Sequence, residues 1–340
     1  MSEYSRPPSF DFGAATLQGF NLPGGKRYLF RVALWTAALL TLAYVILGTP
    51  IVKAYVDVFK NAIEMEHSLD GTTDPDAFLA VMAPMFRAMG MVMLIGLLQV
   101  AIFAAAETAI YRNILHGEDR GVFPLTFGTD EFRVLGTRLV VGLMLGGAYV
   151  GAYLIAFIIG AILVGLAGAT GSSVLAAISG ILIFGLIIVA IAAFVWVAIR
   201  LAPSAAFSVK YRTFNPFASW APMKGLVWPA IGSFLILYLV GYFILNFVIT
   251  IIFIVLFFAS GIMGVIMEID ASANELPDMS PLWEHLSSPG FMIPLILGIF
   301  VSIFLWMIWY GTLWSLWGYL AKQEQGALQP PVTQVEGEIW

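Results

Sequence analysis

The charged residue with the most scope for chemistry is Glu107, which directly follows the apolar run 88–106. An acid at this depth is by default a candidate for coupling a proton or a substrate, and an ion pair between helices is the structural alternative. Arg112 is only about 7 Å further along the helix, but about 140° around it, so the two do not share a face. We therefore expect the partner to come from another helix, with Arg138 and Arg200 as candidates, and we favour the structural pair.

Few other residues point to chemistry. Asn246 lies in the middle of an apolar run, where its amide could bond across helices or line a cavity, and a bond between helices is the commoner outcome. A methionine stripe could bind Cu(I) through its thioethers, but methionine is more often a gap-filler in helix packing (Met82, Met85, Met89, Met93). There is no cysteine, and the three histidines fit no catalytic or zinc motif. The sequence predicts no catalytic residue, no metal and no cofactor.

The elements that must position these residues are membrane spans. Of 340 residues, 60% are hydrophobic and only 11% are charged, well below the proportion in soluble domains. Uncharged stretches cover 32–52, 88–106, 139–199, 225–267 and 286–321, and about 20 residues suffice for one crossing. The third stretch divides at the small, polar residues 168–173, whereas the fourth has no such turn. We predict an all-α, polytopic membrane bundle of six transmembrane helices.

Basic residues indicate the orientation. Thirteen of the sixteen lysines and arginines fall in the two terminal segments and in the second and fourth connections. The positive-inside rule then places both termini in the cytoplasm. The predicted organisation is a cytoplasmic N-terminal segment with an interfacial helix (1–28), one six-helix domain (29–322) and a disordered cytoplasmic tail (323–340). Residues 52–64 have one apolar and one charged face, which predicts an amphipathic helix continuing or following the first span.

Segments of similar character precede the first, third and fifth spans. They cover 10–20, 123–136 and 214–225, and each combines aromatic anchors with a glycine or capping residue. Thr129 is a candidate cap for the second, and Asn215 followed by Pro216 is typical of a helix start. We predict three tandem units, each an interfacial helix and a transmembrane hairpin. Overlapping GxxxG pairs in the third span predict close helix packing, either within the chain or with another copy (Gly142, Gly146, Gly147, Gly151).

Two basic connections resemble a known family. The words YRNILHGE (111–118), LTFGTDEFRVLGTRLVV (125–141) and AIRLAPSAAFSVKYRTFNPFASWAPMKGLVWPAIG (198–232) are similar to bacterial six-span proteins. These include the membrane domain attached to some glycerophosphodiester phosphodiesterases and its stand-alone relatives. Arg200 and the pair Ser219-Trp220 match that family, while Pro222 departs from its continuous helix. The resemblance implies a bacterial inner-membrane protein, but no catalytic residue, and no soluble phosphodiesterase domain follows in the sequence.

Three functions remain open at this stage. The first is a non-enzymatic membrane protein with an organising, assembly or lipid-related accessory role, whose basic interfacial helices lie against anionic inner-leaflet lipids. The second is a transporter or permease for a small or amphipathic substrate, for which the sequence offers few polar residues. The third, a membrane-embedded enzyme acting on lipid, lacks a recognisable pair of acids. We favour the first, with a membrane-protein partner or a second copy possible and with no role for nucleic acid.

Overall fold

Every regular element of the described chain is a helix. The computed structural model describes residues 10–68, 75–268, 284–286 and 288–328. Six of its helices are long and apolar enough to cross a membrane. The prediction of an all-α bundle with six spans is therefore confirmed, including the single span expected within 225–267.

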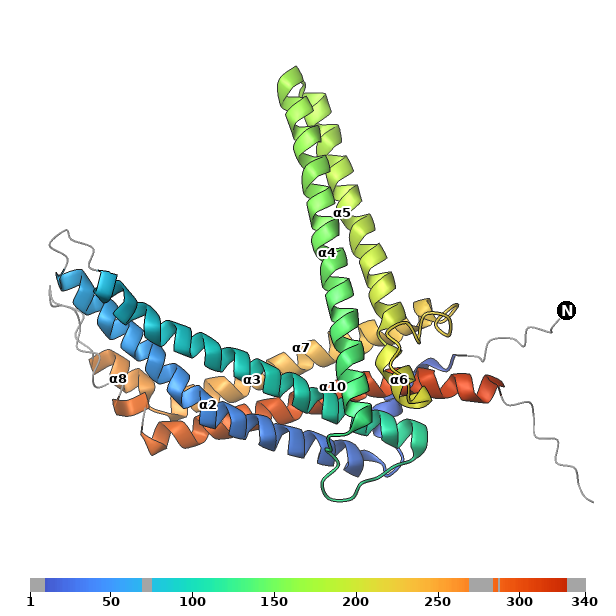
Figure 1. Ribbon diagram of the computed structural model, residues 1–340, viewed down its shortest axis with the longest axis horizontal. Coiled ribbons are helices and arrows are strands. Elements are labelled where there is room, and N and C mark those ends of the chain that lie inside the picture. Colours follow the sequence, from blue (N-terminus) through green and yellow to red (C-terminus); the bar gives the residue numbers. More distant parts are fainter. Residues whose placement is uncertain (1–9, 69–74, 269–283, 287, 329–340) are drawn as a thin grey trace, which may run out of the picture.

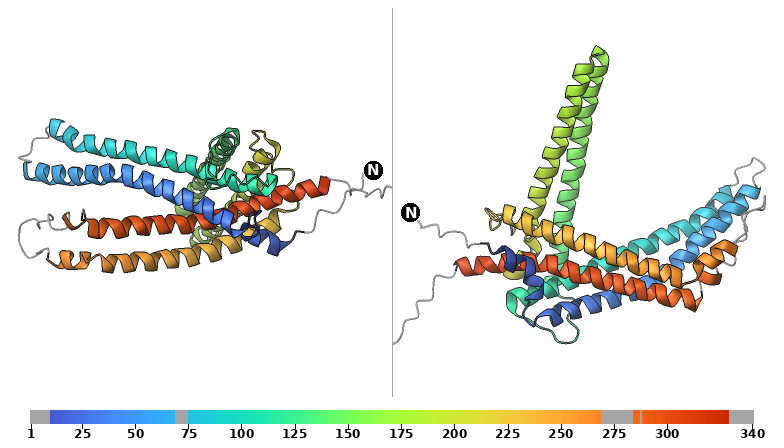
Figure 2. Two further views of the ribbon diagram at one scale, coloured as in Figure 1. Left: turned by 90° about the horizontal axis from the view of Figure 1, so that it is seen from below. Right: turned by 180° about the vertical axis from the view of Figure 1, so that it is seen from behind.

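Four long helices form a bundle: α2 (Lys26–Ser68), α3 (Pro75–His116), α7 (Val227–Ala259) and α10 (Pro289–Leu328). Helix α10 packs against α2, α3 and α7, and α2 and α3 form a hairpin (Figure 1). Figure 2 shows the four helices side by side. Helix α2 continues without a break through the segment predicted to be amphipathic, but most side chains there lie outside the described part of the structure. Short α8 (Ile262–Glu268) follows α7.

The remaining two spans leave this bundle as a hairpin. Helices α4 (Thr129–Thr170) and α5 (Ser173–Leu201) pack against each other and rise steeply from one end of the bundle (Figure 1). The turn falls within the predicted segment 168–173, where Gly171 has a φ of 64° and the Ser172 hydroxyl accepts a hydrogen bond from Leu175 N at 3.2 Å. Most side chains of the hairpin beyond its base are exposed.

We call the end of the bundle where α2 and α7 begin and where α3 and α10 end the basic end. It also holds α1 (Phe12–Leu17), the 3-10 helix η1 (Gln18–Phe20), α6 (Ser204–Tyr211) and the loop 117–128. The largest buried side chains gather there, among them Leu29, Tyr111, Ile114, Phe207 and Leu316. Glycines on α10 make room for them: a Cβ at Gly318 would lie 2.7 Å from Ile114 Cδ1. The tightest packing is thus at the basic end.

Several local predictions were wrong. Helix α4 begins at Thr129 with Gly128 as its N-cap, so Thr129 is the first helical residue and does not cap the helix. Residues 216–226 form successive turns instead of an interfacial helix, because Pro222 has no N–H to continue a helical ladder. Helix α10 continues to Leu328, which makes the first part of the predicted tail helical; residues 329–340 lie outside the described chain.

The predicted close packing at the GxxxG glycines is not made by the residues that the structure describes. No described atom lies within 4 Å of a Cβ built at any of the four (Gly142, Gly146, Gly147, Gly151). The reason is the direction of the hairpin: α4 carries these residues away from the bundle, and α5 packs along another face. A second chain could still provide the predicted neighbour.

Candidate functional site: an ion-pair network at the basic end

Glu107 and Arg138 meet at the basic end. Glu107 is 4% exposed and is flanked on α3 by buried alanines, which let neighbouring helices approach closely. Arg138, from the first turns of α4, donates Nε–H to both carboxylate oxygens of Glu107 at 2.9 and 3.1 Å, and its Nη2 also contacts Oε1. The Tyr111 hydroxyl donates to the same Oε1 at 2.6 Å. Three of these hydrogen bonds end on Oε1 and one ends on Oε2, and all of them are charge-assisted.

The guanidinium of Arg138 also donates hydrogen bonds to groups other than Glu107. Its Nη1 donates to the carbonyl oxygen of Ala202 at 3.1 Å, and its Nη2 donates to the Tyr111 hydroxyl at 3.2 Å. Ala202 follows the last residue of α5, so one side chain ties α3, α4 and the end of α5 together. These contacts fit the predicted ion pair between helices, since Arg138 engages both oxygens of the Glu107 carboxylate.

A second ion pair, which the sequence analysis missed, crosses between the same helices. Arg112 Nη1 lies 2.6 Å from Glu131 Oε1, and both residues are 3% exposed. The Thr126 hydroxyl donates to Glu131 Oε1 at 3.0 Å and accepts from Arg112 and Arg120 at 2.9 Å. The order of charges could have revealed this pair. Helix α3 ends with an acid and then a base, and α4 begins with an acid and then a base. A chain that reverses direction between them brings the first charge of one helix to the last of the other. We call Glu107, Arg112, Glu131 and Arg138 the α3–α4 ion-pair network.

The loop 117–128 is fastened to α2. Arg31 donates to Asp119 Oδ2 and to the Gly121 carbonyl oxygen, both at 2.5 Å. Trp35 Nε1 donates to the carbonyl oxygen of Val122 at 2.7 Å. The hydrogen bond from Arg31 is the main cause that lowers the pKa of Asp119 below its ordinary value.

Helix α6 ties the network to α10. Lys210 is buried and donates to the carbonyl oxygen of Ala321 at 2.8 Å. The hydroxyls of Ser208 and Thr137 lie 3.0 Å apart, which joins α6 to α4. Polar contacts at the basic end therefore link α2, α3, α4, α6 and α10 to one another.

Two of the predicted polar residues lie elsewhere. Arg200 does not reach Glu107; its guanidinium carbon lies 4.9 Å from the centre of the Trp196 ring and 4.1 Å from that of Trp220. Asn246 donates to the carbonyl oxygen of Tyr242, four residues back in its own helix, at 2.8 Å. In the described chain Asn246 therefore bonds within its own helix, and the bond between helices that the sequence favoured is not seen there.

The structure gives little support to metal chemistry in the described residues. No group of three or more His, Asp or Glu side chains there could hold a metal ion. Three of the four methionines considered for copper are exposed on the surface of α3: Met85 at 40%, Met89 at 53% and Met93 at 64%. They form part of the apolar outer surface of a helix that is long and apolar enough to cross a membrane.

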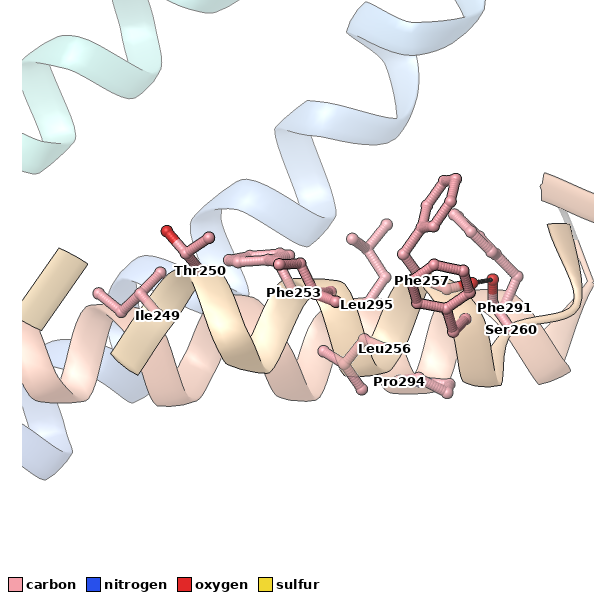
Figure 3. Close-up of a pocket in the computed structure, with 11 residues that line it drawn as sticks. Ile249, Thr250, Phe253, Leu256, Phe257, Ser260, Phe291, Pro294 and Leu295 are labelled. Carbon is pink, nitrogen blue, oxygen red and sulfur yellow. Dashed lines mark hydrogen bonds between the residues drawn. The ribbon is translucent and has the colours of Figure 1, made fainter. Parts of the chain in front are cut away.

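The principal hollows are apolar and lie on the sides of the molecule. One, of about 510 Å³, runs between α1 and η1 on one side and α7 and α10 on the other; we call it the α7–α10 groove. A second, of about 440 Å³, lies near the opposite ends of α7 and α10, where Phe253, Phe257 and Phe291 line it (Figure 3). A third lies at the turn of the α4–α5 hairpin. None of the three is lined by a residue of the α3–α4 ion-pair network.

Comparison of this chain with protein families, with curated proteins and with solved structures found no match.

Proposed function

We propose that this chain is a non-enzymatic protein of the bacterial inner membrane that holds inner-leaflet lipid in the α7–α10 groove and serves as a membrane-organising or assembly factor. Both termini would lie in the cytoplasm. Six crossings return the chain to its starting side, and the positive-inside rule assigns the basic end to the cytoplasm. The resemblance to phosphodiesterase membrane domains agrees with this proposal.

The chemistry of the groove carries the proposal. Its lining is aliphatic and aromatic apart from the hydroxyls of Thr16 and Thr312 and the indole N–H of Trp309. Each of these donates to a backbone carbonyl: Thr16 to Phe12 at 2.7 Å, Thr312 to Trp309 at 2.6 Å, and Trp309 to Leu237 at 3.0 Å. The groove therefore offers no free polar side-chain donor, and an acyl chain is the occupant that suits it.

The dimensions agree with one leaflet. Along α7 the groove runs from Ile236 to Val248, about 18 Å at the helical rise. Half of a bilayer's hydrocarbon core is about 15 Å thick. At the basic end, α1 and η1 form the mouth of the groove and pack closely on α10. Gly19 permits this approach, since a Cβ at its position would lie only 2.8 Å from Thr312 Cγ2. An acyl chain descending from the cytoplasmic surface would fill such a channel.

Transport receives less support. A polar substrate needs accessible polar groups along its path. Glu107 and Arg138 are bonded to each other, and Asn246 is bonded to its own helix. The transporter alternative therefore lacks an observation in its favour.

The test is retention of lipid after purification. Ile244 lines the groove and is 60% exposed, so Ile244→Trp should fill it. Phe243 is 67% exposed and does not line the groove, so Phe243→Trp is the matched control. Native mass spectrometry in mild detergent should show bound phospholipid on the wild type and the control, and much less on Ile244→Trp. Equal lipid on all three proteins would contradict the proposal.

A further inference from the structure

We propose that Arg200 binds the phosphate group of an anionic phospholipid, held for this purpose between Trp196 and Trp220 at the end of α5. The site lies apart from the α7–α10 groove, and the inference does not depend on an acyl chain occupying that groove. It depends on the contacts of Arg200, on the charges around it and on its position.

The contacts of Arg200 leave its donor edge available. The side chain is half-buried and packs against the two indole rings, which engage the guanidinium plane. Its Nε donates to the carbonyl oxygen of Trp220 at 2.9 Å. A guanidinium has five N–H donors, and in the described chain only this one has a hydrogen-bond acceptor. The four on Nη1 and Nη2 form the edge that binds a phosphate through two parallel hydrogen bonds.

The surroundings fix this geometry before any ligand arrives. The Ser219 hydroxyl donates to the Arg200 carbonyl oxygen at 2.7 Å and lies 2.7 Å from the hydroxyl of Ser204. Both serines are fully buried. The segment that carries Trp220 is therefore anchored to the end of α5, so the indole and its carbonyl oxygen stay in place around Arg200.

The charges favour an anion that has no cationic group of its own. Residues 132–267 include six basic side chains but no aspartate or glutamate. Arg138 is neutralised by Glu107, and Arg212 lies 3.9 Å from Glu118. Arg200 has no carboxylate partner among the described residues. A zwitterionic headgroup carries a cationic group, and residues 132–267 contain no acid that could pair with it. Phosphatidylglycerol carries no cationic group.

The position selects a lipid over free phosphate. Arg200 directly follows the apolar run 139–199 and lies in the last turn of α5. Tryptophans concentrate where a span meets the headgroups. Trp228, at the start of α7, is 75% exposed and adds a third indole at this end of the molecule. At the level of the headgroups, the phosphate groups that Arg200 meets belong to the phospholipids of the bilayer.

The experiment measures lipid preference in the full-length protein. Phosphatidylglycerol and phosphatidylcholine of identical chains are titrated onto delipidated protein and followed by native mass spectrometry. Arg200→Gln should bind phosphatidylglycerol about tenfold more weakly, the order expected for losing a charge-assisted pair. Arg200→Lys keeps the charge and the ring contacts but loses the paired N–H donors of the guanidinium. Its affinity for phosphatidylglycerol should therefore be nearly as low as that of Arg200→Gln. Arg212→Gln, which removes an equal but largely exposed charge, is the control and should bind as the wild type does.

Each other result counts against the site. If Arg200→Gln and Arg212→Gln lost affinity for phosphatidylglycerol equally, the lipid would be held by diffuse electrostatic attraction. If Arg200→Lys lost no affinity, a positive charge alone would suffice for binding. Millimolar inorganic phosphate should not displace the lipid; displacement would make free phosphate the ligand and overturn the assignment to a lipid. Ile244→Trp should leave the headgroup preference unchanged, so failure of this site and failure of the proposed groove give different patterns.

Discussion

The ion pair formed by Glu107 and Arg138 makes a quantitative prediction. Glu107→Leu removes both oxygens that Arg138 contacts and leaves its guanidinium with Ala202 and Tyr111. Breaking a buried ion pair by removing one partner costs about 3–5 kcal/mol. The Arg138 side chain is 33% exposed and can reorient, so we expect the lower end, about 3 kcal/mol of unfolding free energy.

Removing both charges should restore most of the loss. Replacing a buried pair with apolar residues of similar volume is often neutral or stabilising. We therefore expect Glu107→Leu with Arg138→Met to lie within about 1 kcal/mol of the wild type. Glu118→Gln is the control, because Glu118 and Arg120 form an exposed pair at 3.4 Å, worth less than about 1 kcal/mol.

Reversible SDS titration in mixed micelles, followed by tryptophan fluorescence, measures these free energies. The reasoning is refuted if Glu107→Leu costs no more than Glu118→Gln. It is also refuted if the double variant is as unstable as the sum of its two single variants, since the charges would then not act on each other.

Three further predictions test other parts of the structure. Because the pKa of Asp119 is lowered in the folded chain, its contact with Arg31 should stabilise the loop at neutral pH and lose this effect as the pH falls through the folded pKa. The protection of residues 117–128 against hydrogen exchange, relative to the intrinsic exchange rate at each pH, should fall in acid, and Asp119→Asn should be poorly protected at every pH. Gly19→Ala should cost about 2 kcal/mol, because its Cβ would press on Thr312, and a thermal melt unchanged from the wild type would contradict that packing. Asn246→Leu should change stability by less than about 1 kcal/mol in the same melts, and a larger loss would mean that the amide bonds another helix after all.

The sequence by itself determined the number of spans and their approximate limits. Span length follows from the thickness of the hydrocarbon core, and charges mark the ends, so composition along the chain is enough. The turn at 168–173 could also be predicted from the sequence, since small polar residues interrupt an apolar stretch that is too long for one crossing. The prediction that an acid at the depth of Glu107 takes its partner from a different helix also rested on helical geometry alone.

Only the tertiary structure decided which residues meet. Arg138 and Arg200 were equal candidates for Glu107, because they flank the two ends of the run 139–199, which was predicted to fold back on itself as two spans. Their rotation about the helix axes separates them: α4 turns Arg138 towards α3, while the chain after α5 brings Trp220 over Arg200. The groove likewise exists only where three distant segments converge. Contacts of this kind depend on how helices cross and rotate in space, which periodicity within one helix does not encode.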